Sequence, residues 1–132
     1  MKVAICVDDA FGMTFFGKRQ SRDRVLIEEL VRTAGGRILI SPFSRLLFEQ
    51  YPAVTVSESF LNDAAEGDLC FVENVPLKPY VDKIDTLIVY HWNRSYPSDK
   101  KLDIDLTCWR LVSTEEFAGS SHEKITKEIY TV

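Results

Sequence analysis

The chain has 132 residues, of which 45% are hydrophobic, and this length suits one domain, residues 1–132, built around one core. Its formal net charge of −4 excludes a general electrostatic attraction to nucleic acid or to an anionic membrane, so a nucleic-acid partner is not favoured. No apolar run is long enough to span a bilayer, and no leader with a small-residue cleavage site is present. We therefore expect a cytoplasmic protein without a membrane partner.

The first half of the chain alternates short apolar strands with amphipathic helices. Residues 3–7 predict a buried strand that enters a long loop at Asp8, and Ser21 is the expected N-cap of a helix with Asp23 in its first turn. Further strands are expected at residues 37–40, 54–56 and 69–72, with helices at 42–50 and 58–65 between them. This alternation indicates parallel strands joined by crossover helices.

The second half changes character. A helical piece at residues 78–81 precedes strands at 86–90, at 106–113 and within 124–132, and no helix separates the last of these strands. Strands without crossover helices pair in antiparallel fashion. The predicted fold is a three-layer α/β fold, with a mostly parallel sheet flanked by helices and with antiparallel C-terminal strands.

Cysteine and histidine residues give little sign of a special site. The three cysteines, Cys6, Cys70 and Cys108, are far apart in apolar surroundings, which predicts small buried side chains rather than a disulfide framework. The two histidines, His91 and His122, belong to no closely spaced pair of ligands. We therefore expect no metal site.

Two stretches of the chain resemble dihydrofolate reductase. Residues 7–13, Val-Asp-Asp-Ala-Phe-Gly-Met, are similar to that family's first strand and the active-site loop after it, where a Gly-Met pair also occurs. Residues 86–91, the polar loop that follows and Trp109 resemble its late strands. The resemblance implies a shortened and divergent dihydrofolate reductase-like domain, in which the strand before Pro52 is missing.

The resemblance also implies a substrate site. Asp23 stands close to the family's acidic residue at the start of the first helix, and an acid in an apolar cleft can orient and protonate a pterin ring. The residues leave open a second interpretation, in which Asp23 is a helix-start carboxylate favoured by the macrodipole. Under the first interpretation Asp23 is catalytic, and Ile5, Met13 and Phe16 bind the substrate.

The family's two phosphate-binding segments are altered in this chain. Pro42 removes an amide from the first segment, and Glu73 places a carboxylate where the second carries a glycine pair. A carboxylate there would repel a phosphate. The remaining candidates for cofactor binding are Ser41, Ser44, Arg45 and Asn74.

Two functional hypotheses follow from these residues. The first is a divergent dihydrofolate reductase-like domain without conventional NADPH-dependent reductase activity, which binds a pterin-like or nucleotide-like small molecule. The alternative is an active NAD(P)H-dependent reductase of a small heterocyclic substrate. NADPH is the cofactor that the resemblance implies, and Glu73 is the main argument against it.

Three other clusters leave alternatives open. The basic residues 18–24 beside Phe15 and Phe16 suit either base stacking or a solvated loop. The aromatic residues near Tyr90 and Trp92 either form a homo-oligomer contact or close the core. The run at residues 120–123, Ser-Ser-His-Glu, is expected to be a turn, because adjacent residues seldom converge into a catalytic triad.

Overall fold

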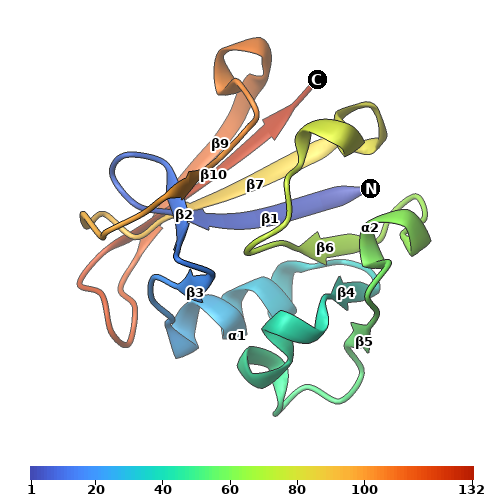
Figure 1. Ribbon diagram of the computed structural model, residues 1–132, viewed down its shortest axis with the longest axis horizontal. Helices are drawn as coiled ribbons and strands as arrows, with labels where there is room; N and C mark the ends of the chain where they lie inside the picture. Colours follow the sequence, from blue (N-terminus) through green and yellow to red (C-terminus); the bar gives the residue numbers. More distant parts are fainter.

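A sheet of seven strands organises the chain, and the computed structural model describes all residues 1–132 (Figure 1). The first five strands in the spatial order β5-β4-β6-β1-β7-β10-β9 pair in parallel, whereas β10 runs antiparallel to both β7 and β9. This confirms the predicted mixed sheet. The strands are β1 (Lys2–Val7), β4 (Ile38–Ile40), β5 (Thr55–Val56), β6 (Leu69–Phe71), β7 (Thr86–His91), β9 (Arg110–Phe117) and β10 (Ile125–Thr131).

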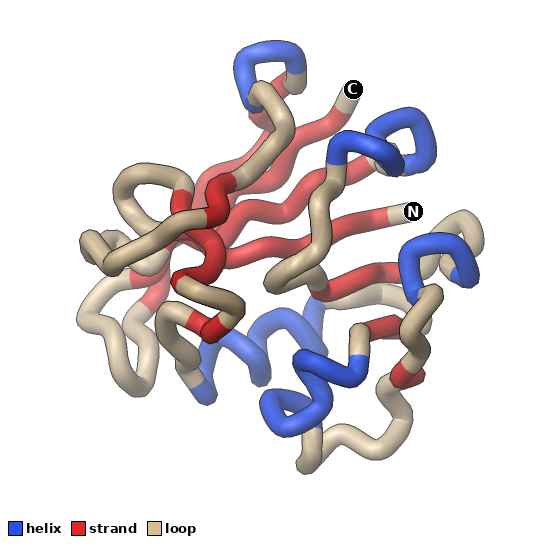
Figure 2. Tube along the Cα trace, in the orientation of Figure 1, coloured by secondary structure: helices blue, strands red, loops and turns tan.

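Helical segments cover both faces of this sheet (Figure 2). The α-helix α1 (Arg24–Thr33) and the 3₁₀ helix η1 (Pro42–Phe48) contribute to the hydrophobic cluster on one face. The short helix α2 (Phe60–Asp63) contributes to the cluster on the other face, and the 3₁₀ helices η2 (Lys78–Lys83) and η3 (Leu106–Cys108) pack against it. The predicted three-layer arrangement is therefore present. None of these helices is long and apolar enough to cross a membrane.

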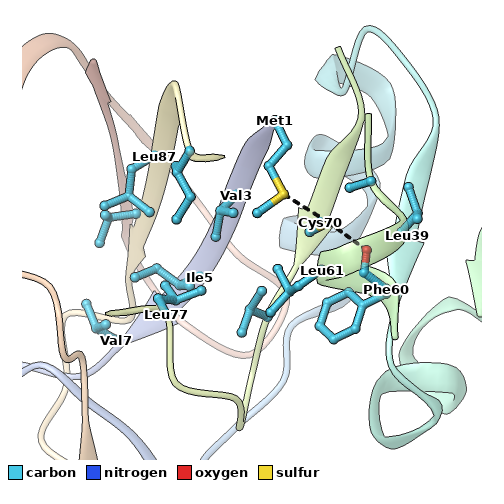
Figure 3. Packing of buried hydrophobic residues seen from close by; sticks show 14 residues of the cluster. Met1, Val3, Ile5, Val7, Leu39, Phe60, Leu61, Cys70, Leu77 and Leu87 are labelled. Atoms are coloured by element: carbon cyan, nitrogen blue, oxygen red, sulfur yellow. Dashed lines mark hydrogen bonds between the residues drawn. The ribbon is translucent and has the colours of Figure 1, made fainter. Parts of the chain in front are cut away.

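The alternation of side chains along β1 explains how one strand serves two cores. Val3, Ile5 and Val7 belong to the cluster on the α2 side, whereas Ala4 belongs to the cluster on the α1 side. Successive residues of a strand point to opposite faces, and both faces are covered here, so β1 is apolar from Val3 to Val7. Figure 3 shows the α2-side cluster, in which the side chain of Leu77 packs beside those of β1.

The predicted long loop after β1 contributes two strands to a small second sheet, and the segment after β7 contributes the third. They are β2 (Gly12–Phe15), β3 (Lys18–Arg19) and β8 (Lys100–Lys101), in the order β3-β2-β8. Phe16 and Gly17 connect β2 to β3 as a two-residue hairpin, and their φ angles are 48° and 73°. Two positive φ angles in succession define a type I′ turn, which favours glycine and matches the twist of a hairpin.

Several predicted boundaries differ from the structure for local reasons. Asp23, not Ser21, is the N-cap of α1, because its carboxylate accepts hydrogen bonds from the backbone amides of the first turn. The segment at 42–50 is a 3₁₀ helix, which ends at Phe48. β9 begins at Arg110 rather than near 106, since Asp105 accepts hydrogen bonds from the amide and hydroxyl of Thr107 and thereby fixes a turn.

A buried polar network links α1 to the antiparallel strands. The Glu29 carboxylate accepts hydrogen bonds from Lys127 Nζ at 2.7 Å and from the Tyr90 hydroxyl at 2.5 Å. Burial, together with the hydrogen bond to Glu29, raises the pKa of Tyr90 far above its ordinary value. Tyr90 and Trp92 are only 0% and 5% exposed, so these two side chains close the core, which is one of the two interpretations that the sequence left open.

Candidate functional site

A narrow cleft lies at the start of α1, beside the ends of β1 and β6. Cys6 comes from β1, Glu73 follows β6, and Asp23 and Trp92 complete much of its wall. The cleft encloses about 20 Å³, which is room for roughly one water molecule. Residues including Asp23 and Leu47 also line an open groove of about 500 Å³, so the cleft continues into a much larger space.

Asp23 is buried at the inner end of this groove, and its carboxylate is almost fully engaged by protein donors. One oxygen accepts from the two amides of the first helical turn at 3.0 and 3.2 Å and from the amide and hydroxyl of Ser120 at 2.9 and 3.2 Å. The other accepts from the Ser121 amide at 2.8 Å and from His122 Nδ1 at 3.0 Å. The carboxylate therefore fastens the β9–β10 loop onto the start of α1.

These donors fix the charge of Asp23. Burial alone would raise the pKa of the carboxyl group, but the hydrogen bonds from His122, Ser120, Ser121 and the helix amide outweigh burial and hold its pKa well below the usual value. Asp23 is therefore an ionised acceptor rather than a source of protons near neutral pH.

His122 extends this network to two hydroxyl groups. Its Nε2 atom lies 2.9 Å from the Tyr96 hydroxyl and 3.2 Å from Ser21 Oγ. The ring stacks on the Trp92 indole at a centroid distance of 4.5 Å, and the His122 side chain is 1% exposed. Three separated segments of the chain thus place an acid, an imidazole and two hydroxyls in one contiguous network beside the cleft.

Glu73 is held on the opposite wall by an internal ion pair. Arg19 donates to both of its carboxylate oxygens, at 2.5 and 2.8 Å, and Ser44 Oγ donates to it at 2.7 Å. Arg19 also donates to the carbonyl of Phe43 and lies over its ring. The carboxylate and its partners consequently occupy the two segments that the resemblance assigned to cofactor phosphates.

The other predicted cofactor residues are more dispersed. Ser41 precedes η1 and makes no side-chain cap, and Arg45 is exposed on η1. Asn74 lines a separate hollow of about 270 Å³ on the far side of Glu73, together with Thr14, Lys100 and Lys101. In that hollow Thr14 Oγ1 and Asn74 Oδ1 are buried without a hydrogen-bond partner.

The predicted substrate residues are also divided. Met13 lines the cleft. Ile5 lies in the core on the opposite face of β1, and its neighbour Cys6 faces the cleft in its place. Phe16, at the tip of the β2–β3 hairpin, is 73% exposed and lines neither the cleft nor the groove. Burial, with further effects from Glu73 and Asp23, raises the pKa of the Cys6 thiol.

The sequence interpretation missed His122, Tyr96 and Arg19 as members of the site. His122 was visible in the Ser-Ser-His-Glu run, but its partners lie about a hundred residues away in sequence, at Asp23 and Ser21. A pairing at that separation is set by the fold, so no local pattern could have shown it. No group of three or more metal-binding side chains comes together in the chain.

The strand order, the helices on both faces and the cleft at the start of α1 define a dihydrofolate reductase-like fold. The structure is similar to that of the dihydrofolate reductase from Enterococcus faecalis complexed with NADP(H) and RAB-propyl, with a TM-score of 0.68 and 16% sequence identity. The match covers 99% of this chain and 95% of that one. No protein-family model matches the sequence, and no curated protein does. At this identity the likeness establishes the fold alone.

Proposed function

We propose that this protein is a divergent dihydrofolate reductase-like domain that binds a pterin-like or nucleotide-like small molecule and lacks conventional NADPH-dependent reductase activity. The observation that carries the proposal is the internal pairing of Glu73 with Arg19 and Ser44. A cofactor phosphate needs free amides, hydroxyls or cations, and here a carboxylate already uses them.

The energetic argument concerns what a phosphate would have to displace. The Arg19–Glu73 pair is bidentate, and the two side chains are only 22% and 10% exposed. Separating such a pair leaves charges with little water to solvate them, at a cost of about 3–5 kcal/mol. A dinucleotide binding at this place would first have to overcome that cost and would then meet the negative charge of Glu73.

The groove supports the small-molecule part of the proposal. Arg22 and Arg24 line it, beside the apolar side chains of Ile27 and Leu47. Arginines beside a few apolar side chains can hold a flat heterocycle that carries an anionic group. Because the lone pairs of Asp23 are engaged by the protein, we propose that Asp23 acts on such a ligand by positioning His122.

The alternative function, an active NAD(P)H-dependent reductase of a small heterocyclic substrate, is favoured by one observation. The hollow around Asn74 combines two unpartnered polar atoms with two lysines, Lys100 and Lys101. A cofactor phosphate or amide could use these groups without disturbing Glu73.

Calorimetric titration of the full-length protein with NADPH, NADH, a pterin and adenosine monophosphate tests both functions. The main proposal predicts saturable binding of the pterin or the mononucleotide. It predicts no binding of NADPH up to about 1 mM; a Kd of about 1 mM corresponds to a binding free energy of about −4 kcal/mol. Saturable NADPH binding that is lost in the Lys100→Ala/Lys101→Ala variant would instead favour the alternative, and oxidation of the bound NADPH by a small heterocyclic substrate would establish it.

A matched pair of variants separates the role of Glu73 from loss of folding. Glu73→Gln keeps the shape of the side chain and removes its charge, and we expect it to improve NADPH binding. Glu116→Gln, which alters an exposed side chain on β9 far from the cleft, is the control and should leave NADPH binding unchanged. If wild-type protein and Glu73→Gln bind NADPH equally well, Glu73 is not the obstacle.

A further inference from the structure

Ser21, His122 and Asp23 have the mutual distances of a nucleophile, a base and an orienting acid. Ser21 Oγ lies 3.2 Å from His122 Nε2, and His122 Nδ1 lies 3.0 Å from Asp23. Such a triad is recognised by geometry rather than by the order of residues in the chain. Ser21 and Asp23 also line the cleft.

The position of the proton on His122 follows from the charge of Asp23. Because Asp23 is ionised, its carboxylate can only accept hydrogen bonds, so a proton resides on His122 Nδ1. In the neutral ring Nε2 is then an acceptor, and it faces the hydroxyls of both Ser21 and Tyr96, at 3.2 and 2.9 Å. Trp92 stacks on the ring and keeps its plane fixed. The imidazole is therefore oriented to take a proton from the serine.

Tyr96 supplies a donor beside the nucleophile. Its hydroxyl lies 3.3 Å from Ser21 Oγ and 2.9 Å from His122 Nε2, so its single proton can be donated to either acceptor. A hydroxyl at this position can donate to the oxyanion that forms when Ser21 attacks a carbonyl, which is the role of an oxyanion-hole donor.

We propose that Ser21 is an acylated nucleophile and that the protein hydrolyses a carboxylic ester bearing an anionic group. Ser21 Oγ forms a bond to the ester carbonyl carbon as its proton moves to His122 Nε2, and the carbonyl π electrons move to the oxygen, which Tyr96 stabilises. When the carbonyl reforms, the ester C–O bond breaks and the leaving alkoxide takes the proton from Nε2. A water molecule repeats these steps on the acyl-serine and releases the carboxylic acid. Asp23 is the positioning residue.

The groove determines the substrate class. It shares Arg22, Asp23, Ile27 and Leu47 with the cleft, so an acyl group can approach Ser21 from the groove. Arg22 is exposed and has no ion-pair partner, which makes it the cation available to an anionic group. The enclosed cleft has a volume of about 20 Å³, so side chains that line it must move to admit an acyl group. The proposal shares the cleft with the proposed function but does not depend on its ligand.

The test is covalent labelling of the full-length protein with a fluorophosphonate, followed by intact-mass and peptide mass spectrometry. We expect one adduct on Ser21. Ser21→Ala should abolish it, and His122→Gln should slow labelling by about 100-fold or more. Ser59→Ala is the matched control, because this exposed serine precedes α2 and lines neither the cleft nor the groove, and it should label at the wild-type rate.

Steady-state hydrolysis distinguishes this role from a structural one. Tyr96→Phe keeps the ring and removes the donor, so we expect kcat to fall by about 100-fold with KM little changed. Arg22→Ala should raise KM for a 4-nitrophenyl succinate monoester but not for 4-nitrophenyl acetate. Circular dichroism checks that each variant is folded. An adduct on any other residue, or folded wild-type protein that neither labels nor hydrolyses either ester, would overturn the proposal whatever the calorimetry shows.

Discussion

Replacing Asp23 with asparagine tests the role of the cleft carboxylate in both folding and chemistry. The amide keeps one acceptor oxygen, and the hydrogen bonds favour placing it where four donors converge, from the first turn of α1 and from Ser120. The NH₂ group then faces the Ser121 amide and His122 Nδ1, which are both donors in the wild-type protein.

The expected loss of stability follows from these contacts. The Ser121 amide loses its acceptor in a buried place, at about 1–3 kcal/mol, and the four remaining hydrogen bonds are no longer made to a charged group. His122 can relieve its own clash by moving its proton to Nε2. We therefore expect Asp23→Asn to lower the free energy of unfolding by about 3 kcal/mol, against a total of about 10 kcal/mol for a chain of this size.

The tautomer change has a chemical consequence. With the proton on Nε2, His122 can no longer accept a proton from Ser21, so labelling and hydrolysis should be lost although the protein remains folded. Urea unfolding followed by tryptophan fluorescence measures stability, and ¹⁵N NMR of the imidazole measures the tautomer. Asp9→Asn, on an exposed loop residue, is the control and should change stability by less than about 0.5 kcal/mol. A similarly small change in Asp23→Asn, or an unchanged tautomer, would refute the reasoning.

Three further predictions concern stability. The folded-state pKa of Asp23 lies below its unfolded value of about 3.9, so the stability that its charge contributes is complete above pH 3.9 and is lost as the pH falls. At pH values below about 4, the urea concentration at the unfolding midpoint should therefore decrease for the wild-type protein. It should decrease less for Asp23→Asn. Glu29→Leu should lower the free energy of unfolding, measured with urea, by about 3–5 kcal/mol, because Lys127 is left charged and buried. Adding Lys127→Met should recover most of that loss. A double variant no more stable than the single one would contradict this. In Gly119→Ala the new methyl group would overlap the Asp23 carboxylate, so we expect the free energy of unfolding to fall by about 1–3 kcal/mol in thermal unfolding. An unchanged melting temperature would show that the loop can move away.

The buried strands were predictable because their signal is local. β1, β4, β6 and β7 are short apolar runs that end at polar or glycine residues, and the helices between the early strands require parallel pairing. The small sheet was harder to predict, since β3 and β8 have two residues each and β2 has four. The Phe16–Gly17 turn was the only local sign of that hairpin.

Candidate residues on the cleft were predictable only in part. The position of Asp23 at the start of a helix was readable from the sequence, because capping depends on neighbouring residues. Its pairing with His122 was not. Whether Ile5 or Cys6 faces the cleft depends on which side of β1 the helix α1 covers, and two adjacent apolar residues in a doubly buried strand give no indication of this.

The sequence by itself determined the elements, the parallel-then-antiparallel order of the strands and the position of Glu73 in a segment suited to phosphate. These features arise from hydrophobic periodicity and from the conformational preferences of single residues, which act within a few positions along the chain. Only the tertiary structure decided that Arg19 neutralises Glu73 and that Ser21, Tyr96 and His122 meet beside Asp23. Contacts between side chains 26 to 101 residues apart depend on how the loops cross the end of the sheet, and that arrangement is fixed by packing of the whole chain.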